Sequence, residues 1–125
     1  MKTFLIVDDM TVIRATIKTI ITQLGVPCEC LEAGDGVEAL RYFAHYKIDL
    51  VFLDWRMPEG SGLEFLRRAR ALQLDVPVIM VTGESDRSKV LEAMRAGAAD
   101  YIVKPVTMEV IKEKLEKLNM LEEAE

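Results

Sequence analysis

Residues 50–54 read Leu50-Val51-Phe52-Leu53-Asp54, four apolar residues followed at once by an acid. A short continuous apolar run is typical of a strand that is buried on both faces of a parallel sheet. The same pattern occurs near the start of the chain, where the apolar residues 4–7 lead into Asp8 and Asp9. The repetition predicts buried strands that each end in a carboxylate.

Between these runs the apolar residues recur at helical spacing, as Ile13, Ile17 and Ile20 do. Gly25 and Pro27 then stop this helix. Strands alternate with helices to the end of the chain, which predicts an α/β fold with a parallel sheet covered on both faces. The expected strands are 4–7, 28–31, 50–53, 77–81 and 101–103, and residues 57–62 are expected to form a loop.

The chain has 125 residues, of which 50% are hydrophobic and 30% are charged, so we expect one globular domain over residues 1–125. A net charge of −5 makes direct binding of nucleic acid unfavourable. The first apolar run is too short for a signal peptide or a membrane span, so we expect a cytoplasmic protein. Cys28 and Cys30 are expected to pack on a strand, because no further Cys or nearby His completes a zinc site and a disulfide between them would be strained.

Polar side chains follow four of the predicted strands. The carboxyl ends of parallel strands meet at one edge of a sheet, where ligands bind. We therefore expect three carboxylates, a hydroxyl and an ammonium group to lie together, from Asp8, Asp9, Asp54, Thr82 and Lys104. Clustered carboxylates repel one another unless a cation joins them, and oxygen ligands suit Mg²⁺ or Mn²⁺. A carboxylate beside such an ion can attack a phosphoryl group, so this conjunction predicts a phosphorylation site.

Five short motifs occur in order along the chain: Val7-Asp8-Asp9, Leu53-Asp54-Trp55-Arg56-Met57-Pro58, Gly60-Ser61-Gly62, Val81-Thr82-Gly83 and Lys104-Pro105. With this set the chain resembles the receiver domains of two-component response regulators, and in layout the stand-alone chemotaxis type. The resemblance covers nearly the whole chain. It implies a flavodoxin-like, doubly wound sheet of five strands in the order 2-1-3-4-5.

The resemblance implies a role for each polar residue at the sheet edge. Asp54 would be the phosphoacceptor, Asp9 a direct metal ligand, and Asp8 a second acid that acts directly or through water. The backbone carbonyl of Arg56 would complete the protein's share of the Mg²⁺ (or Mn²⁺) site. Lys104 would pair with the acceptor or with its phosphoryl group.

The resemblance also implies a switch. Thr82 corresponds to a hydroxyl that turns toward the phosphate, and Tyr101 to an aromatic residue that moves inward on phosphorylation. Pro105 would follow a cis peptide bond. Arg56 and Glu84 flank the site and would influence the lifetime of the phosphoryl group, although both could equally be solvated charges.

A protein of this kind is a signalling switch rather than an enzyme, although it assists its own phosphorylation and dephosphorylation. A sensor histidine kinase or a phosphotransfer protein would supply the phosphoryl group. A downstream protein would bind the face made by the fourth helix, the fifth strand and the fifth helix. We expect a monomer or a weak dimer, without direct binding of nucleic acid and without membrane insertion.

The alternative that stays open is a receiver-like binding module that works without phosphorylation, although such modules usually have a damaged acidic set. A flavodoxin-like electron carrier needs a Ser/Thr/Gly loop after its first strand, where this chain has Asp8-Asp9-Met10. A phosphatase with an aspartyl-phosphate intermediate typically carries a second Asp two residues after its nucleophile, where this chain has Arg56. No P-loop motif occurs in the sequence.

Overall fold

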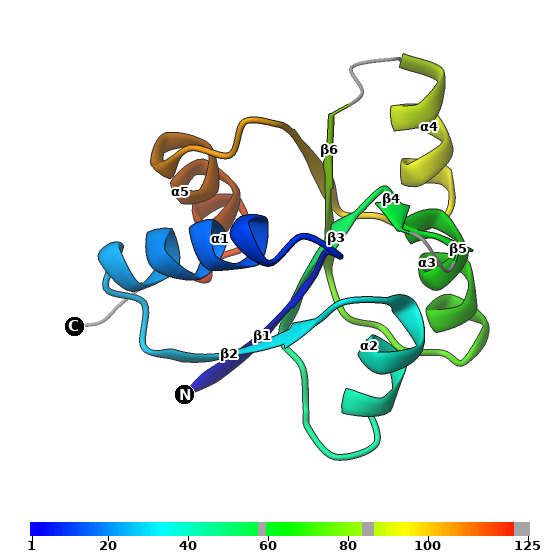
Figure 1. Cartoon of the computed structure of the whole chain (residues 1–125), viewed down its shortest axis with the longest axis horizontal. Helices are drawn as coiled ribbons and strands as arrows, with labels where there is room; N and C mark the ends of the chain where they lie inside the picture. Colours follow the sequence, from blue (N-terminus) through cyan, green and yellow to red (C-terminus); the bar gives the residue numbers. More distant parts are fainter. Residues whose placement is uncertain (58–59, 84–86, 122–125) are drawn as a thin grey trace.

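A computed structural model of the chain describes residues 1–57, 60–83 and 87–121. Five strands form one parallel sheet, with α1 and α5 on one face and α2, α3 and α4 on the other (Figure 1). The elements in chain order are β1 (Lys2–Val7), α1 (Thr11–Gln23), β2 (Cys28–Ala33), α2 (Gly36–Tyr42), β3 (Leu50–Asp54), β4 (Arg56–Met57), β5 (Gly60–Ser61), α3 (Gly62–Ala71), β6 (Val78–Thr82), α4 (Arg87–Arg95), β7 (Asp100–Val103) and α5 (Met108–Lys117).

The strand order in the main sheet is β2-β1-β3-β6-β7, and every neighbouring pair is parallel. Because β4 and β5 lie outside this sheet, β6 and β7 are its fourth and fifth strands. The order is therefore the expected 2-1-3-4-5, and the prediction of a doubly wound, flavodoxin-like α/β fold is confirmed.

The expectation of a plain loop over residues 57–62 is wrong in part. Two-residue strands, β4 and β5, pair antiparallel, with Arg56 opposite Ser61 and Met57 opposite Gly60. A pairing of two residues is too short to show a hydrophobic period, so the pattern could not indicate it. Two residues of the predicted loop, Pro58 and Glu59, lie outside the described residues.

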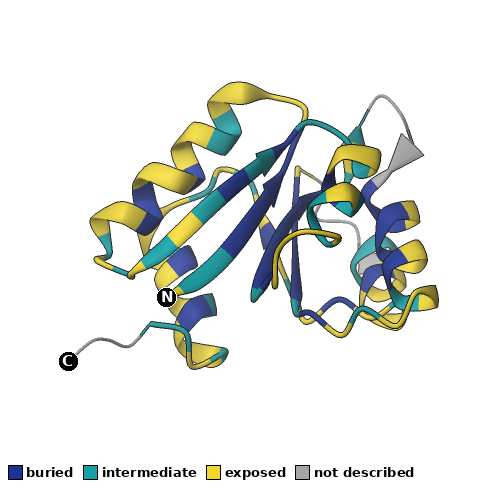
Figure 2. Cartoon of the chain, turned by 90° about the horizontal axis from the view of Figure 1, so that it is seen from below, coloured by how far each residue is buried: buried dark blue, intermediate teal, exposed yellow. Residues whose placement is uncertain are grey.

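The core consists of two layers, one on each face of the sheet. Every residue of β3 and of β6 is buried, which agrees with the continuous apolar runs in the sequence (Figure 2). Successive residues of β3 point to opposite faces: Val51 and Leu53 pack with α2 and α3, whereas Leu50 and Phe52 pack with α1 and α5. Full burial of each such side chain contributes about 1.5–3 kcal/mol, so burial stabilises the strands that position the site.

Local sequence signals set several helix ends. Asp35 accepts a hydrogen bond from Glu38 N (2.8 Å) and caps α2, and Thr107 accepts one from Val110 N (3.2 Å) and caps α5. After α1, Gly25 adopts φ +76°, a left-handed conformation that favours glycine.

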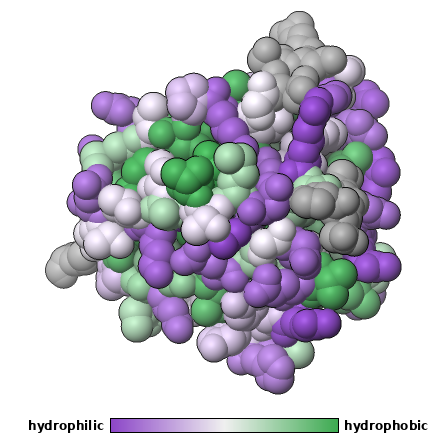
Figure 3. All heavy atoms as spheres, in the orientation of Figure 1, coloured by the Kyte–Doolittle hydropathy of each residue, from purple (hydrophilic) through white to green (hydrophobic). Residues whose placement is uncertain are grey.

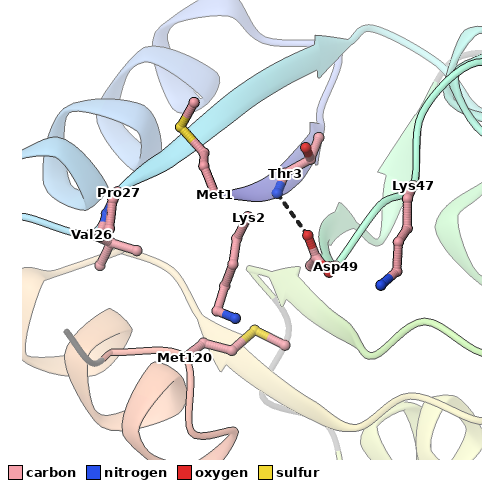
Figure 4. Close-up of a pocket in the computed structure, with 8 residues that line it drawn as sticks. All are labelled: Met1, Lys2, Thr3, Val26, Pro27, Lys47, Asp49 and Met120. Carbon is pink, nitrogen blue, oxygen red and sulfur yellow. Dashed lines mark hydrogen bonds between the residues drawn. The ribbon is translucent and has the colours of Figure 1, made fainter. Parts of the chain in front are cut away.

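The amino-terminal ends of the strands border an open pocket at the opposite end of the sheet from the acidic residues. Asp49 lies in its wall and accepts a hydrogen bond from Thr3 N at 2.8 Å (Figure 4). The pocket is lined by Met1, Lys2, Thr3, Val26, Pro27, Lys47, Asp49 and Met120.

No helix in the described part of the chain is long and apolar enough to cross a membrane.

Candidate functional site

Four neighbouring strands deliver polar side chains to the carboxyl end of the sheet. Asp8 follows β1, Asp54 ends β3, Thr82 ends β6 and Lys104 follows β7. These strands are successive neighbours, and Asp54 pairs in register with Val81, next to Thr82. Lys104 N donates to the carbonyl of Thr82 at 2.8 Å, which fixes Lys104 against the end of β6. The parallel register thus brings together the side chains that the sequence pattern predicted.

Three carboxylates form the centre of the site. One oxygen atom from each of Asp8, Asp9 and Asp54 lies within 4.8 Å of the others. Asp8 and Asp54 are only 1% and 6% exposed, whereas Asp9 is exposed to solvent. The cluster is therefore buried on one side and open on the other, so an ion can enter past Asp9.

One ammonium group lies against the two buried acids. Lys104 Nζ is 3.3 Å from Asp54 Oδ1 and 3.5 Å from Asp8 Oδ2. The Lys104 side chain is 25% exposed, so part of its charge is screened by water. A single positive charge balances at most one of the three carboxylates, and the cluster keeps a negative excess.

The pKa values of the two buried acids reflect this imbalance. Burial raises the pKa of Asp8, and the nearby charge of Asp9 adds to it, although a hydrogen bond from Met10 N (2.9 Å) and the Lys104 ammonium oppose the rise. Burial also raises the pKa of Asp54, and the charge of Asp8 raises it further against the opposing effect of Lys104. Removal from water and mutual repulsion both disfavour the charged forms.

The residues present fit a Mg²⁺ ion. Asp8 Oδ2 is buried and makes no hydrogen bond to any residue that the structure describes, even though Lys104 Nζ lies 3.5 Å away. A buried acceptor without a donor is costly, and a coordinated cation removes that cost. The ligand set consists of carboxylate oxygens beside open solvent, which suits Mg²⁺ because this ion keeps several waters.

A pocket of about 370 Å³ opens above the acids and is lined from several elements. Arg56 lines it from β4, and its side chain is exposed. The ribbon that holds Arg56 packs tightly against the acceptor strand: Gly62 N donates to Trp55 O at 2.8 Å, and a Cβ at Gly62 would overlap the backbone carbonyl of Asp54. Glycine is required here because no side chain fits this close approach. The residues lining the pocket are Asp9, Met10, Asp54, Trp55, Arg56, Thr82, Gly83 and Lys104.

The two predicted switch residues lie around a second, small hollow. Thr82 is 4% exposed and Tyr101 is 37% exposed, yet both line this hollow together with Trp55, Met80 and Ala93. Tyr101 therefore borders the hollow while part of the residue stays exposed to solvent.

Of two further predicted residues, only Pro105 can be placed. The peptide bond between Lys104 and Pro105 is cis, as expected. Glu84 lies outside the described residues.

Arg14 is a residue of the site that the sequence analysis missed. Its guanidinium donates to the backbone carbonyl of Asp8 and pairs with Glu32 of β2 at 3.0 Å. It therefore ties the first turn of α1 to the strand end that carries the buried acid. The only signal in the sequence is that Arg14 is the one charged residue in the first turn of α1, which carries one further charge at Lys18.

A family model for the response regulator receiver domain matches residues 4–116. The chain belongs to this family. It is thus a phosphoaccepting receiver, a signalling module rather than a classical enzyme, and a histidine kinase is the class of partner that a receiver implies. The three clustered carboxylates of this receiver are consistent with the Mg²⁺ site of such domains.

Three relatives illustrate the match. The receiver is 44% identical to a chemotaxis protein CheY homolog of Campylobacter jejuni over 115 residues. These aligned residues cover 90% of this chain and 88% of that protein. The response regulator TrrA of Thermotoga maritima, solved in complex with Mg²⁺ and BeF, is 37% identical with a TM-score of 0.81, covering 94% of this chain and 99% of that one. The CheY of Borrelia burgdorferi, solved in a CheX–CheY–BeF₃–Mg complex, is 29% identical with a TM-score of 0.86, covering 94% and 89%.

The substitution Asp8→Asn tests the charge imbalance of the receiver. Folding raises the pKa of Asp8, so the folded chain holds the carboxyl proton of Asp8 more tightly than the unfolded chain does. The stability of the metal-free protein therefore falls as the pH rises through the raised pKa. An amide keeps the acceptor for Met10 N but cannot ionise. We expect Asp8→Asn to increase the free energy of unfolding near pH 7, in the presence of a chelator, by roughly 1 kcal/mol as measured by urea denaturation.

The control for this experiment is Asp75→Asn, which removes an exposed acid outside the site and should leave the stability almost unchanged. Below the ordinary Asp pKa of 3.8 the advantage of Asp8→Asn should vanish, because Asp8 is then protonated in both states. Saturating Mg²⁺ should stabilise the unaltered chain more than the variant. An Asp8→Asn variant that is less stable than the unaltered chain in chelator would contradict the account.

Proposed function

We propose that Asp54 accepts a phosphoryl group from a phosphohistidine of a sensor histidine kinase or a phosphotransfer protein. Mg²⁺ would be held by Asp8, Asp9, Asp54 and the backbone carbonyl of Arg56. The observation that carries this proposal is the convergence of three carboxylate oxygens within 4.8 Å at the carboxyl ends of the strands, with Lys104 at 3.3 Å from Asp54. The complex of TrrA with Mg²⁺ and BeF supports it, since that relative is 37% identical over 94% of this chain.

The transfer forms one bond and breaks another. A carboxylate oxygen of Asp54 attacks phosphorus, the bond from phosphorus to the donor's imidazole nitrogen breaks, and that nitrogen keeps the electron pair. Lys104 Nζ, already beside Asp54, can pair with an oxygen of the incoming group, and the Thr82 hydroxyl can donate to another. When bound, Mg²⁺ neutralises charge on the carboxylates and on the phosphoryl oxygens.

The approach of the donor is favoured by an apolar surface beside the acids. Met10 and Val12, at the start of α1, are 51% and 60% exposed. Figure 3 shows hydrophobic residues gathered over the area where α1 and α5 lie, among hydrophilic neighbours. An apolar face next to the pocket suits a helical partner that presents its phosphohistidine toward Asp54.

The output surface that we assign is the face made by α4, β7 and α5. Large apolar side chains are exposed on all three elements, and such groups mark protein-binding surfaces. Movement of the buried Thr82 hydroxyl toward a phosphoryl group would alter the hollow that Tyr101 borders and let the ring move inward, a two-state change driven by a local charge. The exposed residues are Leu91, Met94, Tyr101, Val103 and Met108.

Other features belong to the same proposal. Residues 1–125 form one receiver domain, and Arg56 and Glu84 influence the lifetime of the phosphoryl group from the rim of the site. The chain works in the cytoplasm as a monomer or a weak dimer, with no direct binding of nucleic acid. The two free cysteines agree with a reducing compartment.

Phosphorylation of Asp54 can be measured directly by mass spectrometry. Incubation with Mg²⁺ and acetyl phosphate should add one phosphoryl group per chain, in an adduct that is stable to acid and labile to base, as expected for an acyl phosphate. Asp54→Ala should abolish the adduct, whereas Asp75→Ala, at an exposed acid elsewhere, should keep it. Labelling of Asp54→Ala to the full extent would refute the assignment of the acceptor.

Thr82→Ala separates phosphorylation from its transmission. Asp54 and Lys104 are intact in this variant, so it should still bind beryllofluoride, a mimic of the phosphoryl group. Nuclear magnetic resonance shifts on binding should persist at Asp54 but shrink around Tyr101, because the hydroxyl that couples them is missing. Thr19→Ala, on the exposed face of α1, should show the full set of shifts. Full shifts at Tyr101 in Thr82→Ala would mean that the coupling runs through another residue.

A further inference from the structure

Asp8 is held by a hydrogen bond at three of its four polar groups. Its backbone N–H donates to the carbonyl of Ala33 on β2 at 3.0 Å, and its carboxylate oxygen Oδ1 accepts from Met10 N at 2.9 Å. Its backbone carbonyl accepts from the guanidinium of Arg14. The fourth group, Oδ2, is the buried oxygen that makes no hydrogen bond to any described residue. These contacts fix the residue from three sides and leave Oδ2 for a cation.

The guanidinium of Arg14 joins three segments of the chain. Nη1 donates to the Asp8 carbonyl, Nε donates to Glu32 Oε1 of β2 at 3.0 Å, and Nη2 lies 3.4 Å from Thr11 Oγ1 at the start of α1. The Arg14 side chain is only 17% exposed. Hydrogen bonds with one charged partner are roughly twice as strong as neutral ones, and the planar fork of Arg points its donors in fixed directions. The guanidinium therefore links the end of β1 rigidly to β2 and to α1.

The carbonyl that Arg14 holds belongs to the peptide unit between the two adjacent acids, Asp8 and Asp9. A peptide unit is planar, so a fixed carbonyl oxygen restricts the whole unit and with it the direction in which the chain enters Asp9. The hydrogen bond from Asp8 N to Ala33 fixes the preceding unit. The direction of the Asp8 side chain and the position of Asp9 beside it therefore depend on contacts outside the acidic cluster.

We propose that Arg14 is a positioning residue for the Mg²⁺ site. It holds the backbone at Asp8, so that one carboxylate oxygen from each of the three acids stays within 4.8 Å of the others. Glu32 orients the guanidinium in turn, because it accepts from Nε. This role rests on the proposed function, since Mg²⁺ is the ion that the positioned acids would bind.

Charge and geometry predict opposite effects for the loss of Arg14. The guanidinium is a cation near carboxylates that bind a cation, so removal of its charge alone would strengthen Mg²⁺ binding. Removal of its hydrogen bond to the Asp8 carbonyl would let the acids move apart, so the loss of position would weaken Mg²⁺ binding. The sign of the change in affinity therefore distinguishes a positioning role from a purely electrostatic one.

A titration of the full chain with Mg²⁺, followed by the emission of Trp55, measures this affinity. Arg14→Ala should weaken Mg²⁺ binding by about tenfold or more, as is typical when a residue that orients a metal ligand is removed. Arg14→Lys keeps the charge but not the planar fork, so it should weaken binding by a smaller factor. Urea unfolding in chelator checks that each variant is folded, and Arg14→Lys carries the test if Arg14→Ala does not fold.

Lys18→Ala is the matched control. Lys18 is the other cation of α1 and also pairs with Glu32, at 3.6 Å, but its side chain is 50% exposed and lies one turn further along the helix. Because an exposed ion pair contributes little, this variant should bind Mg²⁺ almost as the unaltered chain does. Glu32→Ala should weaken binding by itself but add little to Arg14→Ala, since both residues act through the same contact.

Hydrogen exchange of the metal-free protein gives a second measurement. Met10 N–H donates to Asp8 Oδ1, so the exchange of this amide in deuterated water reports how firmly Asp8 is held. In chelator, Arg14→Ala should speed the exchange of the Met10 amide by a larger factor than that of the amides of β3. A residue that only stabilises the whole fold would speed both by the same factor.

Two results would overturn the role of Arg14. These are Mg²⁺ binding that is unchanged or tighter in the folded Arg14 variants, and equal exchange factors for Met10 and β3. If the unaltered chain showed no Mg²⁺-dependent emission, the metal site itself would be refuted and the role of Arg14 with it. Equal binding of Mg²⁺ by the unaltered chain and by both variants would refute the role of Arg14 alone.

Discussion

Three carboxylates and one ammonium group meet where four parallel strands end, and this imbalance of charge governs the site. Asp8 and Asp54 are held almost out of water by strands whose residues are buried on both faces. The pKa of each is raised, mainly by burial, and Lys104 opposes the rise only in part. The fold thus tolerates a local cost because the core around β1, β3 and β6 is tightly packed. A divalent cation would remove that cost, and this is the physical reason for proposing that the same residues hold a metal and then accept a phosphoryl group.

The arrangement also explains how a local reaction could alter a distant surface. Thr82 is buried at the end of β6, and it borders the same hollow as Tyr101 on β7. Tyr101 is held at its base: its backbone N–H donates to Asp100 Oδ1 at 2.8 Å, and Lys114 Nζ lies 3.2 Å from that oxygen and 5.8 Å from the ring centroid. The start of β7 is therefore anchored to α5, next to the ring that the proposed switch would move. A two-state element of this kind responds to a local change of charge.

Much of the fold and of the site could be predicted from the sequence, because both follow from the same pattern. Apolar runs that stop at Asp8, Asp54, Thr82 and Lys104 indicate parallel strands, and parallel strands place those ends together. The pattern could not predict which of the two adjacent acids is buried. Asp8 is buried and Asp9 is exposed, because of the packing around the end of β1.

The sequence pattern also could not predict which residues of different elements contact each other. Periodicity shows which face of an element is buried, but it does not show which partner meets it. The contact of Arg14 with the carbonyl of Asp8, the β4–β5 ribbon and the 3.9 Å separation of Cys28 and Cys30 all depend on such partners. The roles of the site residues came from resemblance to receivers, and the geometry described above is compatible with each role placed in the described residues.

The central claim is that the buried acids bind Mg²⁺ and then the phosphoryl group at one shared site. Trp55 is the only tryptophan, and it lines the same pocket as Asp54, so its emission reports on that site. A titration with Mg²⁺ should change the emission until it saturates, and beryllofluoride should cause a further change only when Mg²⁺ is present. Identical spectra for the metal-free protein and for the protein with Mg²⁺ and beryllofluoride would contradict the account.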